Sequence, residues 1–191
     1  EKDLKALGEL DGISEAEGSW HEDVLSKIEG SQKVFHVEAM TETVNQLTLV
    51  EGKFPEEPDE CFLDQIFANG NGYHLGDKVH LDPEEDSILE NTDYEVVGIG
   101  TCPMYLSYNR GNTTLGSGEI NAFLYVPAES FDSEVYTEIY LLSEEAENTV
   151  SYTDSYVDLL KEIQGSVEGI EEIRCEERYQ EVVGEAMEKL E

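Results

Sequence analysis

The chain has 191 residues, of which 39% are hydrophobic and 9% aromatic, and this composition excludes an intrinsically disordered protein. Its 45 acidic residues far exceed its 11 Lys and Arg residues, so the formal net charge is -34 and binding to nucleic acid is disfavoured. Such a charge is typical of an acidic coat that keeps a domain in solution, and a specific site for cations or cationic peptides is the alternative.

The first fifty residues are expected to alternate short helices with strands. Apolar residues at helical spacing predict a helix at 4–10, and Gly12 ends it before a strand at 13–20. Ser19 is a candidate N-cap for a second short helix, whose buried face carries Val24, Leu25 and Ile28 and which ends at Gly30. Two further strands are expected, at residues 34–39 and 44–50.

A proline-containing linker, residues 55–59, marks the predicted boundary of a second lobe. Two prolines in five residues preclude a helix there. Short runs of β-branched and aromatic residues follow, separated by turn residues, and they predict a small, mostly β module. Its expected strands lie at residues 75–81, 94–99 and 122–126, and residues 61–67 are expected to form a strand followed by a helical turn.

Between the last two of these strands runs a loop of roughly twenty residues, a length that is uncommon in a compact domain unless the loop is functional. It contains Tyr105, Leu106, Tyr108 and Arg110. Tyr and Arg are favoured at contact hot spots, so these four residues are the candidate partner-contact site. The alternative is that the tyrosines pack the loop onto its own module while Arg110 pairs with nearby acidic residues.

After Pro127 the pattern returns to α/β. We expect a strand at residues 136–142, a helix at 152–163 that Gly165 and Gly169 end, a strand at 170–175 and a last helix from Tyr179 to Leu190. This order resembles a split βαβ unit, and the first fifty residues can supply its counterpart. The prediction is therefore an α+β fold with two lobes: a discontinuous α/β lobe of residues 1–54 and 131–191, and an inserted β-rich lobe of residues 55–130.

No catalytic, cofactor or metal site is predicted, and the chain is not expected to be an enzyme. The acidic turn at residues 82–86 lacks the pattern of an EF-hand, and the glycine-rich residues 111–118 lack the Lys-Ser/Thr pair of a phosphate-binding loop. Cys61 and Cys102 could pair in an exported protein, and the sequence leaves this open. Four histidines match no metal-ligand spacing: His21, His36, His74 and His80.

The sequence contains no run of eighteen apolar residues. Both ends lie in charged, helix-like sequence, as in an excised ectodomain. We therefore expect membrane helices of the same full-length chain to lie just outside residues 1 and 191.

Five segments of the sequence form a recognisable succession: residues 50–64 (VEGKFPEEPDECFLD), 72–81 (GYHLGDKVHL), 94–111 (YEVVGIGTCPMYLSYNRG), 115–131 (LGSGEINAFLYVPAESF) and 136–142 (YTEIYLL). In order and spacing they resemble the extracytoplasmic domain of FtsX/MacB-like ABC transporter permeases, and the likeness is strongest to those of Gram-positive bacteria. In that family a "GR-P" turn precedes an acidic strand start, and here Lys53 replaces the usual Arg.

The resemblance implies a porter-like α/β lobe with an inserted β lobe, at the extracellular face of the cell membrane. It implies a non-catalytic role: a cytoplasmic ABC ATPase subunit hydrolyses ATP, and the domain contacts an extracellular substrate, a protein partner or a second permease copy. Motion would be relayed through the flanking membrane helices. Two other classes of function stay open, a secreted acidic hydrolase or metal-dependent enzyme and a stand-alone cation-binding or adhesin module.

Overall fold

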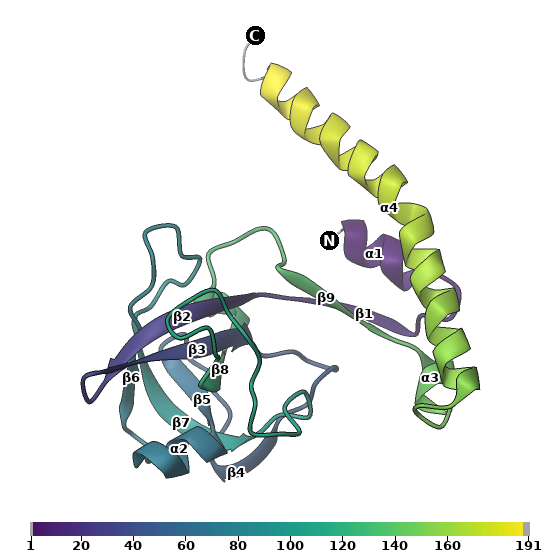
Figure 1. The fold of residues 1–191 in the computed structure, drawn as a ribbon. Helices are drawn as coiled ribbons and strands as arrows, with labels where there is room; N and C mark the ends of the chain where they lie inside the picture. The colour runs from purple at the N-terminus through teal and green to yellow at the C-terminus, as the bar shows by residue number, and fades with distance from the viewer. Residues whose placement is uncertain (1, 189–191) are drawn as a thin grey trace. The chain divides into compact units, whose positions relative to one another are not determined.

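A computed structural model describes residues 2–188 of the chain, which form a mixed α+β fold, as the sequence predicts (Figure 1). The chain divides into two compact units. Unit 1 comprises the residues up to Glu17 and those from Ile139 onward, and unit 2 comprises Gly18–Glu138. Each unit is described by itself below.

Unit 2 is built on a seven-stranded mixed sheet with the strand order β2-β3-β8-β5-β7-β4, and β6 also pairs with β7. The β3–β8 and β5–β7 pairs are parallel, and the other pairs are antiparallel. The strands are β2 (His21–Ile28), β3 (Ser31–Ala39), β4 (Thr48–Gly52), β5 (Glu60–Asp64), β6 (Lys78–His80), β7 (Asp93–Thr101) and β8 (Ala122–Val126).

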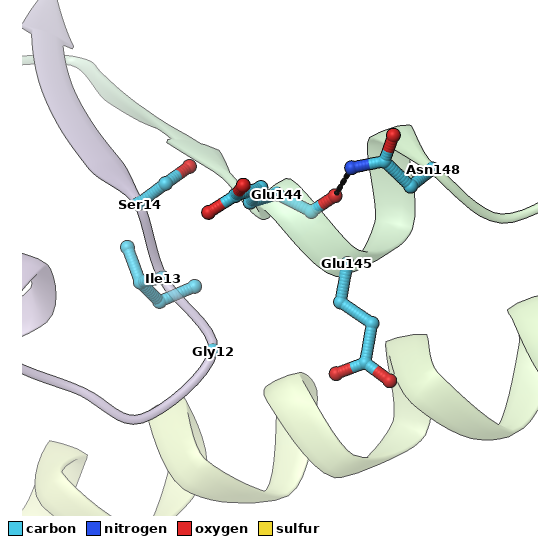
Figure 2. Close-up of a pocket in the computed structure, with 6 residues that line it drawn as sticks. All are labelled: Gly12, Ile13, Ser14, Glu144, Glu145 and Asn148. Atoms are coloured by element: carbon cyan, nitrogen blue, oxygen red, sulfur yellow. Dashed lines mark hydrogen bonds between the residues drawn. The ribbon is translucent and has the colours of Figure 1, made fainter.

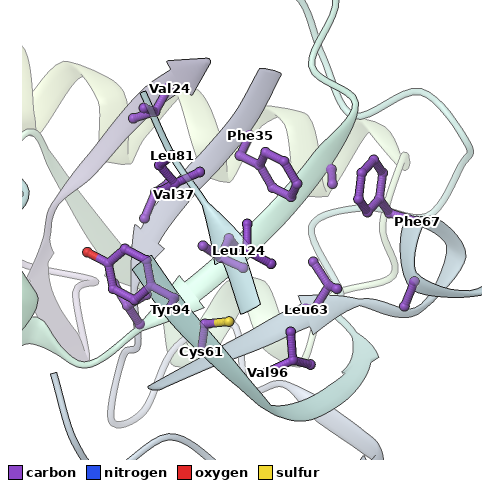
Figure 3. Packing of buried hydrophobic residues seen from close by; sticks show 14 of the residues in the cluster. Val24, Phe35, Val37, Cys61, Leu63, Phe67, Leu81, Tyr94, Val96 and Leu124 are labelled. Atoms are coloured by element: carbon purple, nitrogen blue, oxygen red, sulfur yellow. The ribbon is translucent and has the colours of Figure 1, made fainter. Parts of the chain in front are cut away.

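The first face of this sheet carries the main hydrophobic core (Figure 3). Phe35 and Val37 on β3 lie beside Ala122 and Leu124 on β8, because successive side chains of a strand point to opposite faces. Helix α2 (Gln65–Asn71) covers part of this face, and the ring of Phe67 meets that of Phe35 edge to face at 5.0 Å. Together these side chains form a continuous apolar layer.

The second face of the sheet has a smaller core formed by Phe62, Cys102, Phe123 and Tyr125. It is packed by Met40, Leu47, Leu49 and Tyr105, which come from the loops and edge strand around it. At Gly100 on β7, an added Cβ atom would lie 2.1 Å from the carbonyl oxygen of Thr48 on β4. Glycine is therefore required where these two strands approach each other.

Unit 1 contains α1 (Lys2–Gly8), α3 (Glu144–Glu147) and the long α4 (Asp154–Glu188). Strands β1 (Glu15–Ser19) and β9 (Glu138–Leu142) form a two-stranded sheet. Unit 2 also contains a short 3-10 helix, η1 (Ala128–Ser130), which follows β8. Over residues 2–188, no helix has the length and apolar character needed to cross a membrane.

The prediction of a helix at residues 19–30 is wrong, because residues 21–28 form β2. It pairs with β3 over eight residues, from His21 opposite Glu38 to Ile28 opposite Ser31. The connection is the two-residue turn Glu29-Gly30, in which both residues have positive φ angles, 50° and 81°. Such a turn matches the twist of paired strands, so a hairpin overrides the helical spacing of the apolar residues.

The strand expected at residues 170–175 is also wrong, because α4 is one helix that runs through Gly165 and Gly169. At about 100° of rotation per residue, the apolar stripe of residues 156–163 and that of residues 179–183 lie on roughly opposite sides of the helix. Because the apolar side of the helix changes along its length, the sequence pattern predicts two helices instead of one. Leu190, expected in the last helix, lies outside the described residues.

The division into units differs from the expected lobes. The boundaries expected at 54/55 and 130/131 fall inside unit 2, where β3 of the expected α/β lobe pairs with β8 of the expected insertion. Residues 55–59 form only the connection between β4 and β5, and both of these strands pair with β7. A proline-rich linker is thus compatible with a turn inside one sheet.

Candidate partner-contact surface

The long loop between β7 and β8 folds over the second face of the sheet in unit 2. Its first residue, Cys102, is buried, and its sulfur lies 3.1 Å from the hydroxyl oxygen of Tyr125 on β8. Further along, the Tyr105 ring stacks on Phe123 with the ring centroids 5.0 Å apart. The loop is therefore held to the sheet by its own side chains.

Arg110 provides the strongest attachment of this loop. Its Nε and Nη2 donate to the two carboxylate oxygens of Asp64, at 2.6 and 2.9 Å, in a bidentate ion pair. Both residues are buried, with 6% and 2% exposure. The guanidinium also lies over the rings of Tyr105 and Phe123, 5.7 and 5.4 Å from their centroids, and donates to the carbonyl of Ser107.

Asp64 links this loop to the first face of the sheet, because it also caps helix α2. Its Oδ1 accepts a hydrogen bond from the backbone N–H of Ile66 at 2.9 Å. One carboxylate thus stabilises the start of a helix and neutralises the buried arginine.

The structure separates the four predicted contact residues into two pairs. Arg110 is buried and Tyr105 is partly buried, so both belong to packing, which was the alternative reading. Burial raises the pKa of the Tyr105 phenol, as expected for a ring held against the sheet. Leu106 and Tyr108, by contrast, are 93% and 86% exposed.

Sequence reasoning missed Met104, which is 54% exposed. The signal that could have found it is a gap in the acidic residues. Residues 96–118 contain no Asp or Glu, although 45 of the 191 residues of the chain are acidic. Uncharged side chains that stay exposed on such a protein form a surface suited to protein contact.

A row of polar side chains lies beside the loop on the same face of the sheet. His36 Nδ1 is 2.7 Å from Asp23 Oδ1, and His21 Nδ1 is 3.4 Å from Glu138 Oε1. The rings of the two histidines are 4.9 Å apart. Glu38 is 2% exposed and lies next to His36, with 3.9 Å between His36 Nε2 and Glu38 Oε2.

These contacts shift two pKa values. The hydrogen bond to Glu138 raises the pKa of His21 above 6.5, although partial burial opposes the shift. Burial raises the pKa of Asp23, but hydrogen bonds from His36 and Thr113 outweigh it and the net pKa is lowered. Thr113 belongs to the long loop, so the polar row also contributes to seating the loop.

The described residues do not assemble a metal-binding group. Among residues 2–188, no cluster of three or more His, Cys, Asp or Glu side chains is placed to hold a metal ion. Cys61 and Cys102, whose pairing the sequence left open, are free thiols, and burial raises the pKa of both. A raised pKa suppresses the thiolate that a nucleophile requires.

Unit 1 has a polar hollow of about 480 Å³ beside the start of α3 (Figure 2). Its lining includes Ser14, Glu144, Glu145 and Asn148, and the Asn148 side-chain amide donates to the Glu144 carbonyl at 2.8 Å. Figure 2 shows that the two carboxylates point in different directions. The lining of the hollow contains acidic side chains but no histidine or cysteine.

Comparisons with known proteins give matches only among solved structures. No protein-family model and no curated protein matches the chain. The extracellular domain of the noncanonic ABC-type transporter YknZ from Gram-positive bacteria is similar, with 16% identity, a TM-score of 0.49, and coverage of 87% of this chain and 84% of that chain. The periplasmic region of MacB from Actinobacillus actinomycetemcomitans shows 13% identity and a TM-score of 0.44, over 90% and 80% of the two chains.

Proposed function

We propose that this chain is the non-catalytic extracellular domain of an FtsX/MacB-like ABC transporter permease. It contacts a substrate or partner protein and relays ATP-driven motion through membrane helices of the same full-length chain. Its other partners are a cytoplasmic ABC ATPase subunit and a second permease copy. The proposal includes a porter-like, two-lobed organisation, with the lobes divided at the boundaries of units 1 and 2.

The observation that carries the proposal is the ordered succession of the five resembling segments. They do not scatter over the surface. In the structure they supply most of β4 and β7 and all of β5, β6 and β8, which are five of the seven strands of the main sheet, and all of β9 in the two-stranded sheet. The resembling segments therefore cover most of the strands of unit 2.

The contact role rests on Leu106 and Tyr108. Both stay exposed at the outer side of a loop that Arg110 and Tyr105 fasten from within. A fastened loop loses little conformational entropy on binding, so large exposed side chains on it are suited to be hot spots.

The experiment compares two matched double variants in a strain that lacks the gene. Leu106→Asn with Tyr108→Asn should abolish complementation by the full-length gene, because two contact side chains are lost. The control is Val150→Asn with Tyr152→Asn, which removes an equally exposed apolar pair in unit 1, at 74% and 95% exposure. Equal effects of the two double variants would refute the contact role.

The assignment of the chain to a membrane permease is tested by cell fractionation. The full-length protein should require detergent for extraction and should copurify with an ABC ATPase subunit. A full-length product that is found free of membranes, with no ATPase attached, would overturn the permease assignment.

The relay is tested on α4, which is 35 residues long and therefore spans roughly 52 Å at 1.5 Å per residue. Val183→Pro should break the helix near its end, because proline removes a backbone hydrogen bond and clashes with the preceding turn. We expect loss of transport while unit 2 keeps its thermal unfolding midpoint, followed by the fluorescence of Trp20, the only tryptophan of the chain. Intact transport in this variant would refute the relay.

A further inference from the structure

Two histidines and two carboxylates form a square on the paired strands β2 and β3. The strand register places His21 directly opposite Glu38. It also places Asp23 directly opposite His36. All four side chains point to the second face of the sheet, because the residues that alternate with them, such as Phe35, belong to the core of the first face.

A third carboxylate, Glu138, completes this histidine–carboxylate cluster. Its Oε1 lies 3.4 Å from His21 Nδ1, while His36 lies 2.7 Å from Asp23 and 3.9 Å from Glu38. When the three carboxylates are ionised, two neutral imidazoles leave three negative charges in the cluster, and two protonated imidazoles leave one. Protonation of the histidines therefore lowers the electrostatic repulsion within the cluster.

The other titratable groups that face the cluster keep their charge state near neutral pH. Tyr105 comes from the long loop, and Tyr125 on β8 lies beside Glu38 in the strand register. Burial raises the pKa of both phenols and of the neighbouring Cys102 thiol, so all three stay protonated. The pKa of Asp23 is lowered, so its carboxyl stays ionised. The histidines are thus the side chains whose charge is expected to change near neutral pH.

The cluster contacts the second half of the long loop. Residues 111–120 form a small hairpin, in which the Thr113 N–H donates to the Gly118 carbonyl at 3.1 Å. The Thr113 side chain hydrogen-bonds to Asp23, the carboxylate next to His36. At Gly116 an added Cβ atom would lie 3.3 Å from side chains of β2 and β3, so the turn of the hairpin packs directly on these strands.

The cluster also contacts the segment that leads into β9. The backbone N–H of His21 donates to Thr137 Oγ1 at 2.7 Å, and the Thr137 N–H donates to the Ser19 carbonyl at 3.1 Å. The next residue is Glu138, the carboxylate that pairs with the His21 ring. Two segments that are distant in the sequence are therefore attached to β2 beside neighbouring histidines, whose rings lie 4.9 Å apart.

We propose that the histidine–carboxylate cluster attaches the 111–120 hairpin and residues 136–138 to β2 in a proton-dependent way, firmly when the histidines are protonated and weakly when they are neutral. The contact residues Leu106 and Tyr108 belong to the first half of the loop, which Tyr105 and Arg110 hold through other interactions. The proposal therefore adds a response to pH beside the contact surface, and it stands independently of the permease assignment.

The direction of this response follows from His21. The hydrogen bond to Glu138 raises the pKa of His21 above 6.5, so the folded cluster binds the proton more tightly than the unfolded chain does. The attachment is therefore complete below pH 6.5 and weakens as the pH rises through the raised value.

The test measures amide hydrogen exchange of the isotope-labelled 191-residue chain by NMR, at about pH 5.5 and about pH 8. The reporters are the amides of Thr113, Ile120 and Thr137, whose hydrogen bonds belong to the two attached segments. The control is the amide of Tyr105, which donates to the Cys102 carbonyl in the first half of the loop. After correction for the intrinsic pH dependence of exchange, the reporters should be about fivefold better protected at the lower pH, and Tyr105 should change less than about twofold.

Two variants assign the pH dependence to the histidines. His36→Gln keeps a side-chain donor for Asp23 but cannot be protonated, so the pH dependence at Thr113 should disappear. His21→Gln should remove the pH dependence at Thr137 for the same reason. If either variant fails to fold, the comparison of the reporters with Tyr105 in the unmodified chain decides.

The matched control variant is His80→Gln on β6. His80 also lies between two carboxylates, 3.0 Å from Asp93 and 3.6 Å from Asp82. This substitution should leave the pH dependence of all reporters unchanged, because His80 does not belong to the cluster.

Four outcomes would overturn the proposal. The first is protection of the reporters that does not depend on pH. The second is an equal pH dependence at Tyr105, which would show a change in the stability of unit 2 as a whole. The others are a pH dependence that persists in the folded His36→Gln and His21→Gln variants, and one that His80→Gln removes equally well.

Discussion

Replacing Arg110 should destabilise unit 2 strongly, although the residue lies in a loop. In Arg110→Met the methionine can fill part of the space between Tyr105 and Phe123, but the Asp64 carboxylate is left buried at 2% exposure without its cation. Breaking a buried ion pair on one side typically costs about 3–5 kcal/mol. We therefore expect the free energy of unfolding to fall by about 3–5 kcal/mol, which is a large part of the stability of an ordinary domain.

The double variant Asp64→Asn/Arg110→Met separates the ion pair from simple packing. Asparagine keeps an oxygen that can accept from the Ile66 N–H and carries no charge, so the unpaired carboxylate disappears while the helix cap is retained. The double variant should recover about half or more of the lost free energy, because removing both partners of a buried pair costs far less than removing one.

Urea denaturation followed by Trp20 fluorescence measures both variants, since Trp20 lies in unit 2. A loss below about 1 kcal/mol in Arg110→Met would show that the pair does not hold the loop. A double variant as unstable as the single one would show that the guanidinium acts through packing rather than charge.

Two further predictions concern titration and thiol chemistry. Because the folded-state pKa of His21 is raised above 6.5 by Glu138, the stability that this pair contributes is full below pH 6.5 and is lost as the pH rises through the raised value. His21→Gln should flatten this part of the pH profile in urea denaturation, and an unchanged profile would contradict the assignment. In the native chain a thiol reagent should label the exposed Cys175 at once and the buried Cys61 and Cys102 only after unfolding, and early labelling of all three would contradict the packing.

The strands of unit 2 were predictable where a nearly continuous apolar run is buried on both faces of the sheet. Residues 94–99 and 122–126 contain mostly β-branched, aromatic and aliphatic side chains, and they became β7 and β8 in the middle of the sheet. Residues 19–30 were mistaken for a helix because Val24, Leu25 and Ile28 fit helical spacing. The Glu29-Gly30 turn and the pairing with β3 decided the outcome, and pairing between strands is not visible in a local pattern.

The long loop was predictable from the sequence, but the burial of its individual side chains was not. Its length and its Tyr and Arg content are visible in the sequence alone. Which side chains face inward depends on Asp64, which is 46 residues away in the sequence. Asp64 reaches Arg110 because β5 lies between β7 and β8, the two strands that the loop connects. The local sequence therefore could not show that Tyr105 and Arg110 face the sheet while Leu106 and Tyr108 are exposed.

This division explains why one loop can both be ordered and offer a contact surface. Its inward side chains contact one another and the sheet through an ion pair, a ring stack and a hydrogen bond between Cys102 and Tyr125. None of these interactions uses Leu106 or Tyr108, so truncating those two residues should leave the unfolding free energy nearly unchanged while removing contact area. Surface substitutions away from such features usually change stability by less than about 0.5 kcal/mol. A loop whose stability and binding respond to different residues is one in which function can change without loss of the fold.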